Sequence, residues 1–198
     1  MKLLHIDSSI TGANSVSRKL TARIVDHLKA QNPGLEVTYR DLVTDPAPHH
    51  TEHLWAAKLA GAAGEAHQAD FDAINATLDA FLAADIVVVG APMYNFSIPS
   101  QLKAWMDCLA VAGRTFRYSA NGPEGLAGGR RLIIASARGG VYTTGPAAGM
   151  DHQETYLKAF FGFLGINGIE FVRAEGVLAG PDIAGPAVEA ALSMADAL

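Results

Sequence analysis

A run of hydroxyl-bearing residues, DSSITGANSVS at residues 7–17, follows an apolar stretch and leads into a helical pattern. The first turn of a helix has backbone N–H groups without partners and lies at the positive end of the helix dipole. Ser9, Ser15 and Ser17 can add hydroxyl donors there, and Arg18 adds a positive charge. This segment predicts a phosphate-binding loop. The alternative is that one of its side chains only caps the helix.

Two common phosphate motifs are absent from the chain. There is no G-x-x-x-x-G-K-[ST] segment, which disfavours a P-loop nucleotidase. Gly12 stands alone after the first apolar stretch, so the G-x-G-x-x-G pattern of dinucleotide-binding folds is also missing. Hydroxyl groups and backbone amides suit a phosphate monoester better.

A second segment, APMYNFSIP at residues 91–99, places Met93, Tyr94 and Phe96 between two prolines. Large apolar side chains in a loop are unfavourable unless they cover something, and a flat heteroaromatic ring is a suitable partner. The alternative is that these side chains pack beneath the following helix.

A third segment, ARGGVYTTG at residues 137–145, contains the pair Gly139 and Gly140. Paired glycines let a backbone approach a ligand closely, and their N–H groups can stabilise an anion. The alternative is an ordinary tight turn. Together the three segments predict a phosphorylated flat cofactor, of which FMN is the simplest choice.

These segments follow strands in an alternating βα pattern. Apolar runs predict five strands, at residues 2–6, 35–41, 85–91, 131–137 and 169–174. Helical periodicity predicts helices at residues 15–31, 66–84, 151–164 and 186–198, and one that Ser100 caps. Residues 44–64 read as a loop with one short helix, and residues 114–129 as a hairpin.

This alternation predicts an α/β fold with a parallel sheet covered by helices on both faces. Five strands in one domain, residues 1–198, suggest the flavodoxin-like order 2-1-3-4-5. In that order strands 1, 3 and 4 are neighbours. The three loops described above would then meet at one edge of the sheet.

Composition excludes several classes of function. The 198 residues carry 15 Lys and Arg against 20 Asp and Glu, and this net charge of −5 argues against a nucleic-acid partner. The single cysteine, Cys108, permits no internal disulfide and fits a reducing compartment. No segment has the ~20 apolar residues that a membrane-spanning helix needs. We expect a cytoplasmic protein without a membrane partner.

Five segments of the chain resemble the FMN-dependent NADH-azoreductases, flavodoxin-like enzymes related to the NAD(P)H:quinone reductases. The segments are SSITGANSVSRKL, APMYNFSIPSQLKAWMD, TFRYSANGPEGL, SARGGVY and FFGFLGI. The similarity extends from Lys2 to about Gly180. MYNF and RGG together are far more specific than either alone.

The resemblance implies a homodimer with one FMN in each subunit and two active sites at the interface. It implies phosphate contacts from Ser9, Ser15, Val16 and Ser17, and a ring site made by Pro92, Met93, Tyr94, Asn95, Phe96, Ala137, Arg138, Gly139 and Gly140. It also suggests that Phe96, Tyr118 and Phe163 lie near the substrate. Residues 44–64 and 143–152 are expected at the rim of the site.

The implied activity is reduction of quinones and azo compounds with NADH or NADPH. Because one site would serve both substrates in turn, we expect ping-pong kinetics. The flavin carries out the redox chemistry, so no catalytic side chain is named. The alternative is a flavodoxin-like electron carrier that docks on protein partners; such carriers tend to be more acidic than this chain.

Three histidines, His49, His50 and His53, have a spacing that could suggest a metal site. Pro46 and Pro48 lie just before them and disfavour a helix at this point. We therefore predict a solvated loop and no metal ion.

Overall fold

Strands and helices alternate along the chain in the computed structural model, which describes residues 1–198. The strands are β1 (Lys2–Asp7), β2 (Glu36–Asp41), β3 (Ile86–Pro92), β4 (Phe116–Ser119), β5 (Gly122–Gly125), β6 (Arg131–Ala137) and β7 (Ile169–Ala174). The α-helices are α1 (Val16–Gln31), α2 (Glu52–Ala60), α3 (Gln68–Ala83), α4 (Ser100–Leu109), α5 (Glu154–Phe163) and α6 (Pro181–Ala195).

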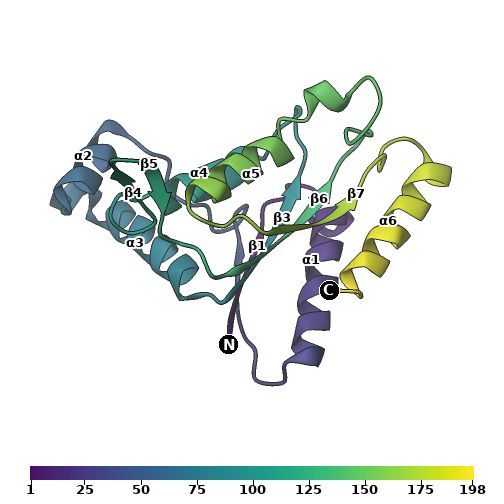
Figure 1. Cartoon of the computed structure of the whole chain (residues 1–198), viewed down its shortest axis with the longest axis horizontal. Helices are drawn as coiled ribbons and strands as arrows, with labels where there is room; N and C mark the ends of the chain where they lie inside the picture. Colours follow the sequence, from purple (N-terminus) through teal and green to yellow (C-terminus); the bar gives the residue numbers. More distant parts are fainter.

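Five strands form one parallel sheet in the order β2-β1-β3-β6-β7 (Figure 1). With the β4–β5 hairpin set aside, this is the predicted order 2-1-3-4-5. Asp7 pairs with Gly90 and Pro92 pairs with Ala137, so β1, β3 and β6 end close together. The predicted convergence of their loops is therefore confirmed.

Helices cover both faces of the sheet, and the strands bury side chains on both. In β3, Val87 and Val89 belong to the larger apolar cluster, with residues of α3, α4 and α5. Ile86 and Val88 point to the opposite face and belong to a second cluster, with residues of α1 and α6. Successive residues of a strand face opposite sides, so a continuous β-branched run suits a strand covered twice.

The five helices with a predicted start begin one to five residues from that position, and two of these differences involve proline. Ser100 is the first residue of α4 and not its cap; Pro99 holds that position. The last helix begins at Pro181, and Pro186 lies inside it. Pro186 lacks an N–H and so forfeits one helical hydrogen bond, but Ala191 and Ala195 are fully buried against the sheet and hold the helix in place.

The predicted short helix and hairpin are both present. Thr51 caps α2 by accepting a hydrogen bond from the N–H of Leu54. The β4–β5 hairpin lies beside the C-terminal end of α5 (Figure 1). None of the helices combines the length and the apolar character needed to cross a membrane.

Candidate cofactor site

A cavity of about 370 Å³ lies at the carboxyl edge of the sheet, between the loops that follow β1, β3 and β6. Nine of the predicted cofactor residues line it, namely Ser9, Ser15, Val16, Ser17, Pro92, Met93, Tyr94, Ala137 and Gly139. They come from segments as far apart as residues 9 and 139. The volume falls within the range of roughly 300–1,000 Å³ typical of small-molecule sites.

Four further residues, which were not singled out from the sequence, also line the cavity. They are Thr11, Asn14, Val177 and Leu178. The first two belong to the hydroxyl-rich segment already singled out. The other two follow β7, the neighbour of β6, so the predicted strand order could have indicated them.

The N-terminus of α1 forms the polar end of the cavity. Ser15 caps the helix by accepting a hydrogen bond from the N–H of Arg18, and its Oγ lies 3.1 Å from Oγ of Ser17. The N–H groups of Val16 and Ser17 lie in the first turn, where the helix itself offers no acceptor. Capping and anion binding are thus compatible, because one serine caps while the other donors remain available.

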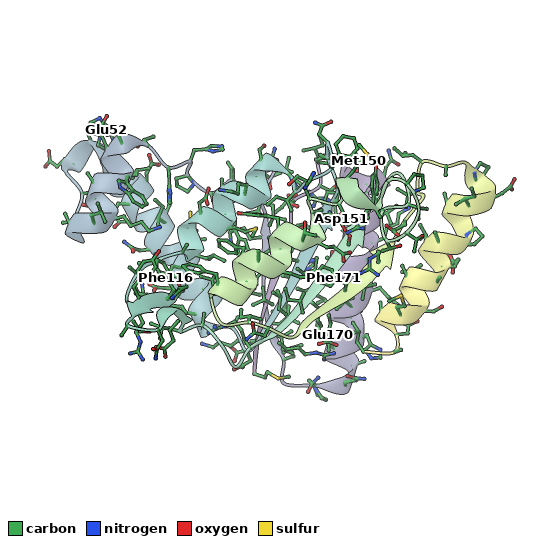
Figure 2. The ribbon with its side chains drawn as sticks, turned by 45° about the horizontal axis from the view of Figure 1, so that its top comes forward. Glu52, Phe116, Met150, Asp151, Glu170 and Phe171 are labelled. Carbon is green, nitrogen blue, oxygen red and sulfur yellow. The ribbon has the colours of Figure 1, made fainter.

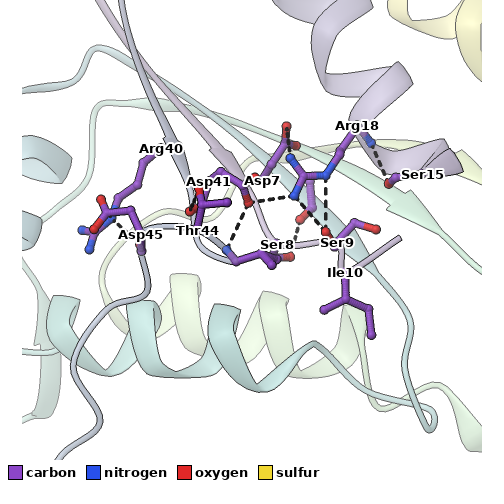
Figure 3. Close-up of polar contacts among 12 residues, drawn as sticks. Asp7, Ser8, Ser9, Ile10, Ser15, Arg18, Arg40, Asp41, Thr44 and Asp45 are labelled. Carbon is purple, nitrogen blue, oxygen red and sulfur yellow. Dashed lines mark hydrogen bonds and ion pairs between the residues drawn. The ribbon is translucent and has the colours of Figure 1, made fainter. Parts of the chain in front are cut away.

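Arg18 has a different role from the one its position suggests. Its guanidinium donates to the carbonyl oxygen of Ser9 at 2.8 Å and to the carboxylate of Asp41 at 2.7 Å (Figure 3). It does not line the cavity. Burial raises the pKa of Asp41, but hydrogen bonds from Arg18 and from the N–H of Val43 outweigh it and lower the pKa. Arg18 therefore holds the backbone of the loop at residues 7–17 from outside the cavity.

The loop after β3 makes a tight turn at Tyr94–Ser97. Two backbone hydrogen bonds join these residues, and both central residues have positive φ, 49° at Asn95 and 71° at Phe96. This is the geometry of a type I′ turn, which is unfavourable for a bulky residue such as phenylalanine. Backbone strain of this kind is found at ligand-binding sites.

Tyr94 connects this turn to the loop at residues 7–17, which follows β1. Its hydroxyl accepts a hydrogen bond from the N–H of Ile10 at 3.1 Å and lies 3.2 Å from Oγ of Ser9. Two of the three predicted loops are therefore in direct contact.

The glycine pair presents free donors. The carbonyl of Gly139 accepts from the N–H of Leu178, and that of Gly140 accepts from the N–H of Gly176. The N–H groups of both glycines have no acceptor within the chain. A Cβ at Gly139 would come within 2.9 Å of the Leu178 side chain, so a larger residue would crowd the wall of the cavity.

Four predicted cofactor residues do not line this cavity. Asn95 lines an adjoining cavity of about 820 Å³, which shares Met93 and Tyr94 with the first. Phe96 is partly exposed and contacts the ring of Tyr142 edge-on, and Gly140 lies against the same ring. The side chain of Arg138 is fully buried and turned toward three carboxylates.

Two of the predicted substrate residues also lie outside the cavity. Tyr118 is 76% exposed on the hairpin, and Phe163 packs against Phe116 with ring centroids 4.5 Å apart. Phe116 lies at the far end of α5 from Met150 and Asp151 (Figure 2). Within one chain, these aromatic residues are not brought to the predicted cofactor.

The histidine-rich segment forms no metal centre. His53 stacks on His67, and His50 packs near Trp55. No three His, Cys, Asp or Glu side chains lie close enough together to hold a metal ion.

Comparison with known proteins identifies close relatives of the chain. A sequence model of the family described as having a flavodoxin-like fold matches residues 1–198. An FMN-dependent NADH:quinone oxidoreductase of Rhizobium meliloti is 60% identical over 184 residues, covering 92% of this chain and 89% of the relative. The FMN-dependent NADH:quinone oxidoreductase 2 of Bradyrhizobium diazoefficiens is 54% identical, covering 100% of this chain and 98% of the relative.

Solved structures agree with this similarity. The azoreductase AzrA superposes with a TM-score of 0.93 at 31% identity, covering 100% of this chain and 98% of that one. An FMN-dependent NADH-azoreductase from Bacillus anthracis, solved with FMN, has a TM-score of 0.87 at 28% identity and covers 99% of this chain and 98% of that one.

Proposed function

This chain belongs to the family with the flavodoxin-like fold, and from that premise we propose that it is an FMN-dependent oxidoreductase that reduces quinones and azo compounds with NADH. The observation that carries the proposal is the cavity in which a helix N-terminus, an aromatic loop and the free N–H of Gly139 meet. The close relatives named for this activity cover nearly the whole chain.

The residues around the cavity fit FMN. The hydroxyl groups of Ser9, Ser15 and Ser17 and the first-turn N–H groups of α1 suit a phosphate ester. Met93 and Tyr94 offer an apolar surface for a flat ring, and Leu178 adds an apolar side chain to the same cavity. The unpartnered N–H of Gly139 can donate to a polar ring edge.

Bound FMN would supply the redox chemistry, which passes electrons from NADH to the acceptor. The chain's own residues bind and orient the partners. No carboxylate, imidazole, ammonium or guanidinium group lines the cavity, so we name no catalytic side chain. The fixed N–H dipole of Gly139 is suited to stabilising negative charge that develops nearby.

We also propose that residues 1–198 form one FMN-binding domain, that the two substrates use the site in turn, and that the active unit is a cytoplasmic homodimer. Phe96 borders the site in this chain, whereas Tyr118 and Phe163 lie at the other end of α5. If these two residues contact substrate, they do so from a second copy of the chain.

The test uses purified protein loaded with FMN and kept under argon. NADH should bleach the flavin absorption bands, and a quinone added afterwards should restore them. Initial rates measured against NADH concentration, at several fixed quinone concentrations, should give parallel double-reciprocal lines. Intersecting lines would contradict alternate use of one site.

The same experiment separates the enzyme from an electron carrier. An enzyme of this kind consumes NADH continuously when a quinone is added, with no other protein present. A carrier would need a separate reductase to take electrons from NADH. A colourless protein that takes up no FMN would exclude both functions.

A further inference from the structure

Arg138 carries a charge into the interior next to the cofactor cavity. Its side chain has no exposed surface, and every part of its guanidinium group is engaged. Nε donates to Oε1 of Gln153 at 2.9 Å, and Nη1 donates to Oε1 of Glu175 at 3.0 Å. Nη2 lies 3.0 Å from Oδ2 of Asp151 and 2.8 Å from Oε1 of Glu154. We call these five residues the Arg138 cluster. Burial of a charge is unfavourable unless it is paired this completely.

At one end of the cluster, Glu175 forms hydrogen bonds with the turn that follows the glycine pair. Its carboxylate accepts hydrogen bonds from the N–H of Tyr142 at 2.8 Å, from the N–H of Thr143 at 3.1 Å and from the hydroxyl of Thr143. Burial raises the pKa of Glu175, but the hydrogen bonds from Thr143, Tyr142 and Arg138 outweigh it and lower the pKa. The carboxylate therefore stays ionised at neutral pH.

At the other end, the cluster reaches the last residues of β3, and its neighbour His152 reaches the loop that follows. Asp151 accepts from the N–H groups of Gln153 and Glu154, and so orients the start of α5. The side chain of Gln153 donates to the carbonyl of Ala91 at 2.7 Å. The N–H of His152 donates to the carbonyl of Phe96 at 3.0 Å.

The cluster thus ties together two walls of the site that the sheet alone does not align. β3 and β6 are paired as far as Pro92 and Ala137, and the chain leaves the sheet beyond them. From there, N–H groups of the β7–α6 segment donate to the carbonyls of residues 138–140, and Glu175 accepts from the N–H groups of Tyr142 and Thr143. The edge-on contact between Phe96 and Tyr142, with centroids 6.2 Å apart, bridges the same two walls.

We infer that Arg138 and Glu175 are positioning residues, which hold the turn at residues 139–143 in the form that leaves the N–H of Gly139 free for the cofactor. This inference rests on the proposed function for the identity of the ligand. It gives the Arg138 side chain a role other than direct contact with FMN. A guanidinium that contacts several carboxylates is suited to this role, since its donors have fixed directions.

Glu175→Gln tests the inference with almost no change in volume. A matched control is Glu170→Gln, because Glu170 pairs with Arg131 at 2.7 and 2.9 Å near the starts of β7 and β6, the two strands that Glu175 and Arg138 directly follow. That pair lies at the opposite edge of the sheet, away from Asp151 (Figure 2). FMN affinity is measured by titration, and hydrogen exchange of the amides at residues 139–143 is measured without FMN.

We expect Glu175→Gln to weaken FMN binding about tenfold and to speed amide exchange at residues 139–143 but not in β6. Glu170→Gln should change neither. A role in global stability alone would accelerate exchange in β6 as well and leave FMN affinity intact below the unfolding temperature. Either that pattern or wild-type behaviour of Glu175→Gln would overturn the inference.

Thr143→Val provides a second variant should Glu175→Gln fail to fold. It removes one hydroxyl contact to Glu175 at an exposed position. It should weaken FMN binding and speed amide exchange at residues 139–143, each by a smaller factor than Glu175→Gln. Wild-type FMN affinity and wild-type exchange at these residues would contradict the inference. Wild-type protein that binds no FMN would instead refute the proposed function, while the exchange measurement would still report on the turn.

Discussion

The phenol oxygen of Tyr94 lies 3.2 Å from Oγ of Ser9, so residues 85 positions apart in the chain are in contact across the cofactor cavity. The N–H of Ile10 donates to the same phenol oxygen at 3.1 Å. Tyr94 therefore has two functions in this site. Its side chain lines the cavity, and its hydroxyl fixes the position of the loop at residues 7–17, to which we assign the phosphate of FMN.

Tyr94→Phe removes this hydroxyl and keeps the ring. We expect FMN affinity to fall about five- to tenfold, since one hydrogen bond contributes about 1 kcal/mol. Titration of both proteins with FMN measures the change. A cycle with Ser9→Ala and the double variant, scored by the free energy of unfolding without FMN, should show coupling between the two positions. Strictly additive effects would contradict the contact.

Ser17→Ala should distinguish phosphate binding from ring binding. The Ser17 hydroxyl lies at the N-terminus of α1, at the polar end of the cavity. We expect the affinity for FMN to fall about tenfold, whereas the affinity for riboflavin, which lacks the phosphate, should stay the same. Ser193→Ala is the control, because Ser193 also lies in a helix but bonds only to the carbonyl of Glu189. Equal losses for FMN and riboflavin would place the phosphate elsewhere.

Gly125→Ala should loosen the hairpin that carries Tyr118. A Cβ at Gly125 would overlap the backbone of Leu164 and Gly165, which cannot move aside as a flexible side chain would. Overpacking of this kind destabilises a protein by about 1–3 kcal/mol. Denaturant unfolding measures the loss. Gly34→Ala is the control, because a Cβ there meets nothing within 4 Å. Similar unfolding midpoints for the two variants would show that the close approach is not required.

Cys108 should be unreactive in the folded protein. It is fully buried, and burial raises the pKa of its thiol to about 11. Only the thiolate is nucleophilic, so a thiol reagent at neutral pH should react no faster than the chain unfolds. Rapid labelling of the native protein would contradict this environment.

The same raised pKa predicts a change in stability at alkaline pH. An unfolded thiol ionises near pH 9, whereas the folded one stays protonated up to about pH 11. Between these values the unfolded state binds fewer protons, so the free energy of unfolding should fall by about 1.4 kcal/mol per pH unit. Cys108→Ala should remove this part of the dependence. If the free energy of unfolding of the wild type and of Cys108→Ala changed equally with pH between 9 and 11, the prediction would be wrong.

The β-strands could be predicted closely because their pattern is local. The run from Ile86 to Ala91 is apolar throughout, and both faces of β3 are indeed covered. The bounds of β6 and β7 agree with the prediction residue for residue. Helix ends are harder to predict, as α6 shows. Pro186 forfeits one hydrogen bond inside this helix, but burial of Ala191 and Ala195 against the sheet offsets that loss.

The sequence by itself determined which segments form strands and helices, and therefore that three chemically distinct loops meet at one sheet edge. It also supplied nine of the residues that line the cavity. Only the tertiary structure decided where long side chains point and which remote segments touch. Arg138 turns inward because Asp151, Glu154 and Glu175 surround it there. Val177 and Leu178 reach the cavity because β7 lies beside β6. The residue patterns that specify a helix or a strand extend over a few neighbouring residues. Ion pairing and side-chain packing instead depend on residues that lie far apart in the chain and meet only in the folded protein.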